Sequence, residues 1–166
     1  MRLFFLFSIL FFLAACSSEN EAAAPVETGA RAEEGFYFAY KNEKVYMDGD
    51  ITDALARIGE PRSVYEEPSC AFDGIDKIFR YPGFDIYTYP EKEKDFIHQI
   101  YFRDDSVSTA EGIFIGGSYE EMVSAYGSGY EREQSQYAYA DGRTRLQFIL
   151  SDGGIIEAIT YRLIME

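Results

Sequence analysis

Few residues of this chain have the chemistry that catalysis needs. The sequence contains one histidine, His98, and two cysteines, Cys16 and Cys70. Nucleophilic catalysis requires a nucleophile beside a base that activates it, so Cys70 with His98 is the pair to consider. Cys70 falls in an expected loop and has no electropositive or motif context that would activate its thiol. We therefore expect no catalytic residues, and we interpret Cys70 as a small buried apolar residue.

His98 lies inside an expected strand, residues 96–102, where it shares one face with Phe96, Ile100 and Phe102. If this face packs in the core, the imidazole is poorly accommodated there. If a β-bulge intervenes, the imidazole is instead exposed. Both alternatives give His98 a structural or surface role.

Carboxylates are common, and the one local cluster is formed by Asp48, Asp50 and Asp53. This stretch lacks the D-x-[DN]-x-[DN]-G order of a calcium loop and the glutamate at its twelfth position. A similar stretch later in the chain has Ser118 and Glu121 at equivalent places. We therefore interpret Asp50 as a helix cap and Asp53 as a first-turn residue that favours the helix dipole. Calcium binding is the alternative, and no metal site or cofactor is predicted.

The aromatic content is high, with 14 tyrosines, 14 phenylalanines and no tryptophan. Tyrosine combines an apolar ring with a polar tip, which suits a wet binding face. Strand alternation places several tyrosines opposite apolar residues that are expected in the core. The alternative is that tyrosine is simply a favourable strand residue in a small domain. The candidate binding residues are Tyr87, Tyr89, Tyr101, Tyr137 and Tyr139.

These side chains must be positioned by elements that the sequence encodes twice. Residues 45–61 and 113–129 follow the same pattern, in which an apolar run leads into a glycine and a capping residue. Apolar residues then recur at helical spacing until another glycine ends the pattern. The two stretches predict short helices over residues 51–58 and 119–126.

Each expected helix precedes three expected strands. In the first half two β-rich runs flank Pro82-Gly83, and in the second half two such runs flank Asp141-Gly142, which predicts two hairpins. The last expected strand of each half, residues 96–102 and 155–161, has apolar residues at matching positions. A two-turn helix is not stable alone in water, so each helix must lie on a sheet.

We therefore predict an α+β fold, in which two helix–three-strand repeats (about 45–103 and 113–164) form one curved antiparallel sheet. This sheet would have about six strands, with both short helices on one face and the other face open or partly covered. Residues 36–40 would form an edge strand or the start of the globular domain, residues 36–166.

The N-terminus has a different pattern. Residues 1–15 combine Arg2 with an apolar run that is too short to span a bilayer stably, which predicts a signal peptide. The sequence Leu13-Ala14-Ala15-Cys16 resembles the lipobox of bacterial lipoproteins. This resemblance implies that Cys16 is acylated, with palmitate among its acyl chains, and becomes the mature N-terminus. Residues 16–35 are then the lipidated cysteine and a disordered tether.

The lipobox resemblance also implies a location. The protein would be anchored by lipid to the cell membrane or the outer membrane, facing outside the cytoplasm. The alternatives are an ordinary signal peptide cut nearby and an uncleaved anchor. With Cys16 acylated, Cys70 has no partner in the chain for a disulfide.

The charge limits the partners. Cleavage before Cys16 removes Arg2 and leaves 14 basic and 29 acidic residues, a net charge of −15. Such a surface repels nucleic acid and anionic lipid headgroups, so we expect no nucleic-acid binding. A basic or apolar protein partner would suit this charge.

A tandem of short, glycine-ended helices, each followed by three strands, behind a lipobox resembles the beta-lactamase inhibitory protein-like fold and the related small outer-membrane assembly lipoproteins. The resemblance covers about residues 45–164 and rests on pattern and topology. It implies a non-catalytic, protein-binding role through the exposed sheet face and loops. The alternatives are an accessory or assembly subunit of an envelope complex, or an envelope hydrolase that uses paired carboxylates or Cys70.

Overall fold

Two short helices begin at the caps that the sequence predicts. In α1 (Ile51–Ile58) the Asp50 carboxylate accepts a 2.9 Å hydrogen bond from the Thr52 amide. In α2 (Tyr119–Tyr126) Ser118 and Glu121 form a reciprocal capping box. Each helix ends at a glycine with positive φ, which residues with a side chain adopt only at a cost. The predicted bounds of both helices are confirmed.

The computed structural model describes residues 35–165. The predicted signal peptide, Cys16 and nearly all of the predicted tether lie outside these residues. None of the helices in this part of the chain is long and apolar enough to span a membrane. The strands are β1 (Tyr37–Tyr40), β2 (Glu43–Tyr46), β3 (Ser63–Pro68), β4 (Ile75–Arg80), β5 (Phe84–Glu91), β6 (Lys94–Phe102), β7 (Glu131–Glu133), β8 (Gln136–Asp141), β9 (Thr144–Leu150) and β10 (Ile156–Leu163).

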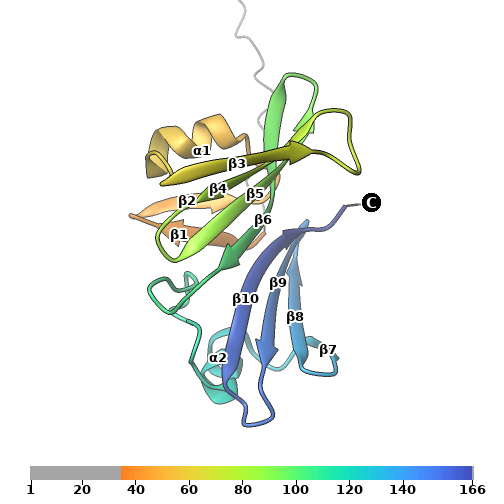
Figure 1. Cartoon of the computed structure of the whole chain (residues 1–166). Coiled ribbons are helices and arrows are strands. Elements are labelled where there is room, and N and C mark those ends of the chain that lie inside the picture. The colour runs from red at the N-terminus through yellow and green to blue at the C-terminus, as the bar shows by residue number, and fades with distance from the viewer. Residues whose placement is uncertain (1–34, 166) are drawn as a thin grey trace, which may run out of the picture.

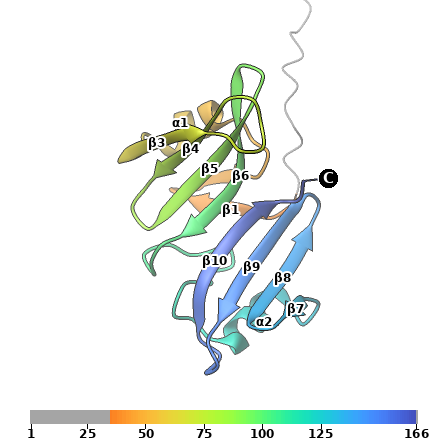
Figure 2. The same cartoon turned by 45° about the vertical axis from the view of Figure 1, so that its right-hand side comes forward.

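Eight of these strands form one antiparallel sheet in the order β3-β4-β5-β6-β10-β9-β8-β7 (Figures 1 and 2). Each helix is followed by four strands rather than the predicted three. The two additional strands, β3 and β7, are the sheet edges, and all of their residues are exposed. Edge strands like these bury no apolar face, so their sequences lack the alternation that identifies a half-buried strand.

The two halves of the sheet meet where β6 pairs with β10. The register opposes Ile100 to Tyr161, Tyr101 to Thr160 and Gln99 to Arg162. Ile100 and Tyr161 are both fully buried on the helix side of the sheet. Side chains of both halves therefore form one hydrophobic core beneath α1 and α2. The α+β class and the large antiparallel sheet are confirmed.

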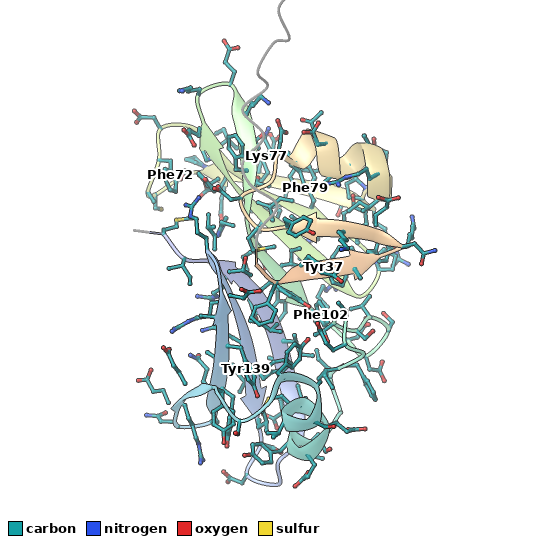
Figure 3. The ribbon with its side chains drawn as sticks, turned by 180° about the vertical axis from the view of Figure 1, so that it is seen from behind. Tyr37, Phe72, Lys77, Phe79, Phe102 and Tyr139 are labelled. Atoms are coloured by element: carbon teal, nitrogen blue, oxygen red, sulfur yellow. The ribbon has the colours of Figure 1, made fainter. Side chains whose placement is uncertain are left out.

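The β1–β2 hairpin covers the middle of this core instead of extending the sheet. It forms a separate two-stranded sheet, and Figure 3 shows it on the same side as both helices. The Phe38 ring lies 4.7 Å from that of Phe84 and 5.1 Å from that of Phe102, between centroids. Phe38 also reaches Tyr161 in β10, at 6.2 Å. The hairpin thus seals the junction of the two halves on one face and leaves the opposite face uncovered there.

Candidate functional site

The candidate site lies on the face of the sheet opposite the helices, called here the open face. Antiparallel pairing aligns the outward side chains in rows that run across the strands. One row crosses six strands, from β3 to β9, and consists of Tyr65, Ile78, Tyr87, Gln99, Arg162 and Arg145. The neighbouring row contains Arg80, Asp85, Tyr101, Thr160 and Gln147.

Where the halves join, the open face is hollowed. The hollow has a volume of about 380 Å³. We call it the waist hollow, and its lining residues come from strands of both halves. They are Tyr87, Gln99, Tyr101, Gln136, Gln147, Ile149, Ala158, Thr160 and Arg162. None of these is a carboxylate, and Arg162 is the only charged member. The lining offers amide, hydroxyl and guanidinium groups around a small apolar floor, which suits hydrogen bonding to a polar chain.

Tyr87 and Tyr101 are the two candidate tyrosines that line the waist hollow. The expectation that Tyr89, Tyr137 and Tyr139 are also on a wet face is wrong, because these residues are 6–8% exposed. Tyr137 and Tyr139 pair across the strands with core residues of β9, so they lie on the helix side. The hydroxyl of Tyr139 donates to the Gly127 carbonyl at 2.7 Å, and burial raises its pKa to about 12.

Tyr89 is buried for a different reason. The β3–β4 loop carries Phe72 over it, with ring centroids 4.9 Å apart. Its hydroxyl donates a 2.6 Å hydrogen bond to the buried carboxylate of Asp48. The polar tip that favours a binding face is in this case satisfied inside the protein.

His98 is the extra residue of a β-bulge. The β5–β6 register shifts between Tyr87 and Thr88, which pair with Gln99 and Ile97 and leave His98 unpaired. The imidazole lies between the rings of Tyr87 and Tyr89, with its centroid 6.3 Å from each. The bulge alternative is therefore the correct one, although the side chain is half-buried rather than free. Burial lowers the pKa of His98, the carboxylate of Asp76 opposes this, and the guanidinium of Arg162 adds to it.

Positive charge gathers beside the waist hollow. Arg103 lies 3.6 Å from the carboxylate of Asp85, and Arg80 is opposite Asp85 on β4. Burial raises the pKa of Asp85, and the two guanidiniums oppose this shift. On the other side Arg145 is opposite Arg162 and forms an ion pair with Glu131. Within residues 35–165, the guanidinium of Arg162 has no hydrogen bond or ion pair.

Cys70 is exposed on the β3–β4 loop, which corrects the prediction that it is buried. The loop turns at Gly74 and Ser69, whose hydroxyl accepts from the Phe72 amide at 3.1 Å. It projects beyond the sheet (Figure 3), and Phe72 folds back onto Tyr89. No hydrogen bond joins Cys70 to His98 in the described part of the chain.

The carboxylates of the first acidic stretch point at protein donors rather than at one another. Asp50 caps α1 and forms a 2.7 Å ion pair with Lys94, while Asp48 binds Tyr89 and Arg143. Burial alone would raise the pKa of Asp50, but the Lys94 and Thr52 hydrogen bonds bring it below its ordinary value. No group of three potential metal ligands exists among residues 35–165. The capping interpretation is confirmed by these contacts.

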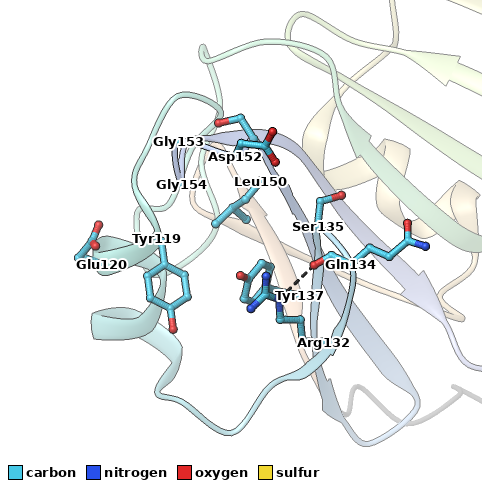
Figure 4. A pocket seen from close by; sticks show the side chains of 11 residues that line it. Tyr119, Glu120, Arg132, Gln134, Ser135, Tyr137, Leu150, Asp152, Gly153 and Gly154 are labelled. Carbon is cyan, nitrogen blue, oxygen red and sulfur yellow. Dashed lines mark hydrogen bonds between the residues drawn. The ribbon is translucent and has the colours of Figure 1, made fainter.

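A larger pocket, of about 820 Å³, lies between the start of α2 and the β7–β8 and β9–β10 turns (Figure 4). Three of its lining side chains, Tyr119, Arg132 and Tyr137, are already in contact with neighbouring groups. The Arg132 guanidinium lies 5.0 Å from the Tyr137 ring centroid, and its Nε donates to the Gln134 carbonyl at 3.0 Å. The hydroxyls of Tyr119 and Tyr130 are hydrogen-bonded at 2.7 Å. The waist hollow, with its unpaired guanidinium, is the more available surface for a ligand.

Sequence reasoning missed the glutamines and Arg162. The alternation of polar and apolar residues in β9 and β10 indicates that Gln147, Thr160 and Arg162 face outward. It does not indicate that β10 pairs with β6, which is the contact that brings these residues beside Tyr101.

No protein-family model and no curated protein matches the chain. Among solved structures, the chain is similar to a DUF4309 family protein from Bacillus subtilis, with a TM-score of 0.39 and 16% identity over 69% of this chain and 78% of that one. It is also similar to an extracellular protein containing a SCP domain from Bacillus anthracis, with a TM-score of 0.40 and 17% identity over 70% of this chain and 43% of that one. At this level the similarity carries no argument about function.

Proposed function

We propose that this protein is a non-catalytic binding module, anchored by lipid outside the cytoplasm, that holds a protein partner on its open face. The observation that carries the proposal is the waist hollow, a concave surface lined by Tyr87, Tyr101 and hydrogen-bonding side chains of both halves. Both helices and the β1–β2 hairpin cover the opposite face and leave this one accessible. Tyrosines within a concave polar rim are common at protein interfaces.

The anchor and its location rest on the sequence. The apolar run of residues 3–13, which ends in Leu13-Ala14-Ala15-Cys16, supports lipidation of Cys16. In a bacterial host the full chain should partition into the detergent phase of a Triton X-114 extraction. The Cys16→Ser variant should move to the aqueous phase or keep its signal peptide. Equal partitioning of the two chains, both with intact signal peptides, would contradict lipidation at Cys16.

The tandem-repeat relationship is also part of the proposal. It is supported by the matching order of helix and strands in the two halves and by the equivalent caps Asp50 and Ser118. A resemblance to the beta-lactamase inhibitory protein-like fold would then explain why the uncovered sheet face serves for binding.

Site-specific photocrosslinking in the native envelope tests the binding face. A benzoylphenylalanine at Gln147, in the waist hollow, should capture a discrete partner, whereas one at Ala56 on the exposed face of α1 should not. Substituting Tyr87 and Tyr101 together by alanine should reduce the crosslinked band without lowering the melting temperature by more than a few degrees. The matched control is Tyr46→Ala in the β1–β2 hairpin.

Two results would count against the proposal. Crosslinks at Gln147 and Ala56 of equal yield, or none at either position, would remove the open face as the binding surface. A partner that copurifies with the uncrosslinked chain in constant stoichiometry would instead identify an assembly subunit of a larger envelope complex.

A further inference from the structure

The charge of the waist hollow is opposite to the charge of the chain. The sequence carries 29 acidic and 15 basic residues, which favours a basic partner. However, the nine residues that line the hollow include one guanidinium and no carboxylate. Three further arginines lie beside it on the open face, Arg80, Arg103 and Arg145, and two acids of this face, Asp85 and Glu131, are each close to one of these arginines. Two other acids lie at its margin, because the carboxylate of Asp76 acts on His98 and Glu133 is opposite Gln136. The lining of the hollow itself is therefore positively charged within an acidic protein.

Arg162 is the guanidinium best placed to bind a ligand. It is exposed, it lines the hollow, and its guanidinium has no hydrogen bond or ion pair to any described residue. Its cross-strand neighbours are Gln99 and Arg145, and neither accepts its protons as a carboxylate would. A planar guanidinium with free donors binds a carboxylate in a bidentate manner.

The row that contains Arg162 also has an apolar half. From the sheet edge inward it presents Tyr65 and Ile78, then Tyr87, then Gln99, and only then Arg162. Adjacent strands are about 4.8 Å apart, so Tyr87 and Arg162, which are two strands apart, are separated by about 10 Å. An extended peptide covers this distance in about three residues. Ile78 is one strand further, which corresponds to about four residues.

We propose that the open face binds an extended, acidic segment of a protein partner that carries an apolar side chain and, about three or four residues away, a carboxylate bound by Arg162. The apolar side chain packs on Tyr87 and Ile78. The backbone of the segment hydrogen-bonds to Gln99, Gln147 and Thr160. This inference rests on the proposed function and specifies the partner that the open face selects.

The surrounding charge strengthens the selection. The chain outside this face is acidic and repels an acidic partner, so a productive contact is confined to the few arginines of the open face. A basic partner would be attracted to the acidic remainder of the surface but would meet Arg162 in the hollow and Arg145 beside it. Binding of an acidic segment is therefore expected to be specific and moderate in affinity rather than tight.

Panning a library of random twelve-residue peptides against the full chain, immobilised in detergent through its C-terminus, tests the inference. Enriched peptides should carry aspartate or glutamate three or four residues from a large apolar residue. The Arg162→Gln variant should lose the enrichment by at least tenfold. The matched control is Arg57→Gln, which makes the same change of charge on α1 at the other face of the sheet. Melting curves of both variants verify folding.

The outcomes separate this inference from the function on which it rests. The inference would be overturned, with the open face kept as a binding surface, if the peptides need Tyr87 and Tyr101 but are basic or neutral. Peptides that need these tyrosines and bind Arg162→Gln equally well would have the same consequence. Peptides indifferent to all open-face substitutions, or no enrichment, would overturn both. Two further results would overturn the inference by identifying another occupant. If sedimentation shows a dimer that dissociates in Arg162→Gln, the occupant is a second copy of the chain. If the chain binds phosphatidylglycerol vesicles and Arg162→Gln does not, the occupant is a lipid headgroup.

Discussion

The guanidinium of Arg143 is bonded to the carboxylate of Asp48 across 95 residues of sequence. Arg143 lies in the β8–β9 turn of the second half, and Asp48 lies just before α1 in the first. The other carboxylate oxygen of Asp48 accepts the Tyr89 hydroxyl, and both Asp48 and Tyr89 are buried. This contact ties the two halves together in addition to the β6–β10 pairing.

Replacing Tyr89 by phenylalanine should therefore destabilise the fold. The variant keeps the ring contacts with Phe72 and Phe96 but removes a hydrogen bond to a buried carboxylate, which should cost about 1.5–3 kcal/mol. Urea unfolding followed by circular dichroism measures the loss. The control is Tyr101→Phe, whose hydroxyl lines the open hollow and should cost under about 0.5 kcal/mol. Equal losses in the two variants would show that the Asp48 contact contributes nothing.

The pKa of His98 should lie below its ordinary value of about 6.5. Burial lowers this pKa, Asp76 opposes the shift and Arg162 adds to it, so Arg162→Gln should raise the pKa and Asp76→Asn should lower it further. The chain has one histidine, so a single imidazole signal in an NMR titration reports the value. A pKa at or above 6.5, or one unchanged in both variants, would refute this electrostatic arrangement.

The same shift makes stability depend on pH. Because the folded pKa of His98 is lowered, the unfolded chain takes up the proton first as the pH falls. The contribution is fully present above about pH 6.5 and is lost as the pH falls from there towards the folded pKa. Urea unfolding at pH 7.5 and 5.5 should show this loss in the wild-type chain and less of it in His98→Gln.

Gly83, in the β4–β5 turn, should tolerate a side chain poorly. Its φ is +82°, and a Cβ there would collide with Ser106 and Val107. Gly112 has a similar φ of +86° but nothing within 4 Å, so Gly112→Ala should cost only the left-handed backbone, about 1 kcal/mol. Gly83→Ala should cost more, because its neighbours must also move. Equal unfolding free energies for the two variants would contradict the close approach.

The thiol of Cys70 should react without unfolding. It is exposed on the β3–β4 loop, so in a Cys16→Ser background one equivalent of Ellman's reagent should be consumed by the native protein. Adding urea should not increase the number of thiols that react. A thiol that reacts only above the unfolding midpoint would restore the interpretation of Cys70 as a core residue.

The sequence alone determined the local structure of this protein. Asp50 and Ser118 start the helices, glycines end them, and Pro82-Gly83 and Asp141-Gly142 form hairpin turns, because each of these signals acts over a few neighbouring residues. The α+β class follows from their order.

Only the tertiary structure decided which tyrosines are exposed and which residues meet. A bulge at His98 and the cover provided by Phe72 separate Tyr87 from Tyr89, although the two are alternate residues of one strand. The β6–β10 pairing brings Gln99 beside Arg162, which are 63 positions apart. Strand alternation specifies two faces but not which elements cover them, because that depends on contacts between distant segments, and this is why the waist hollow and its positive charge were not predictable from the sequence.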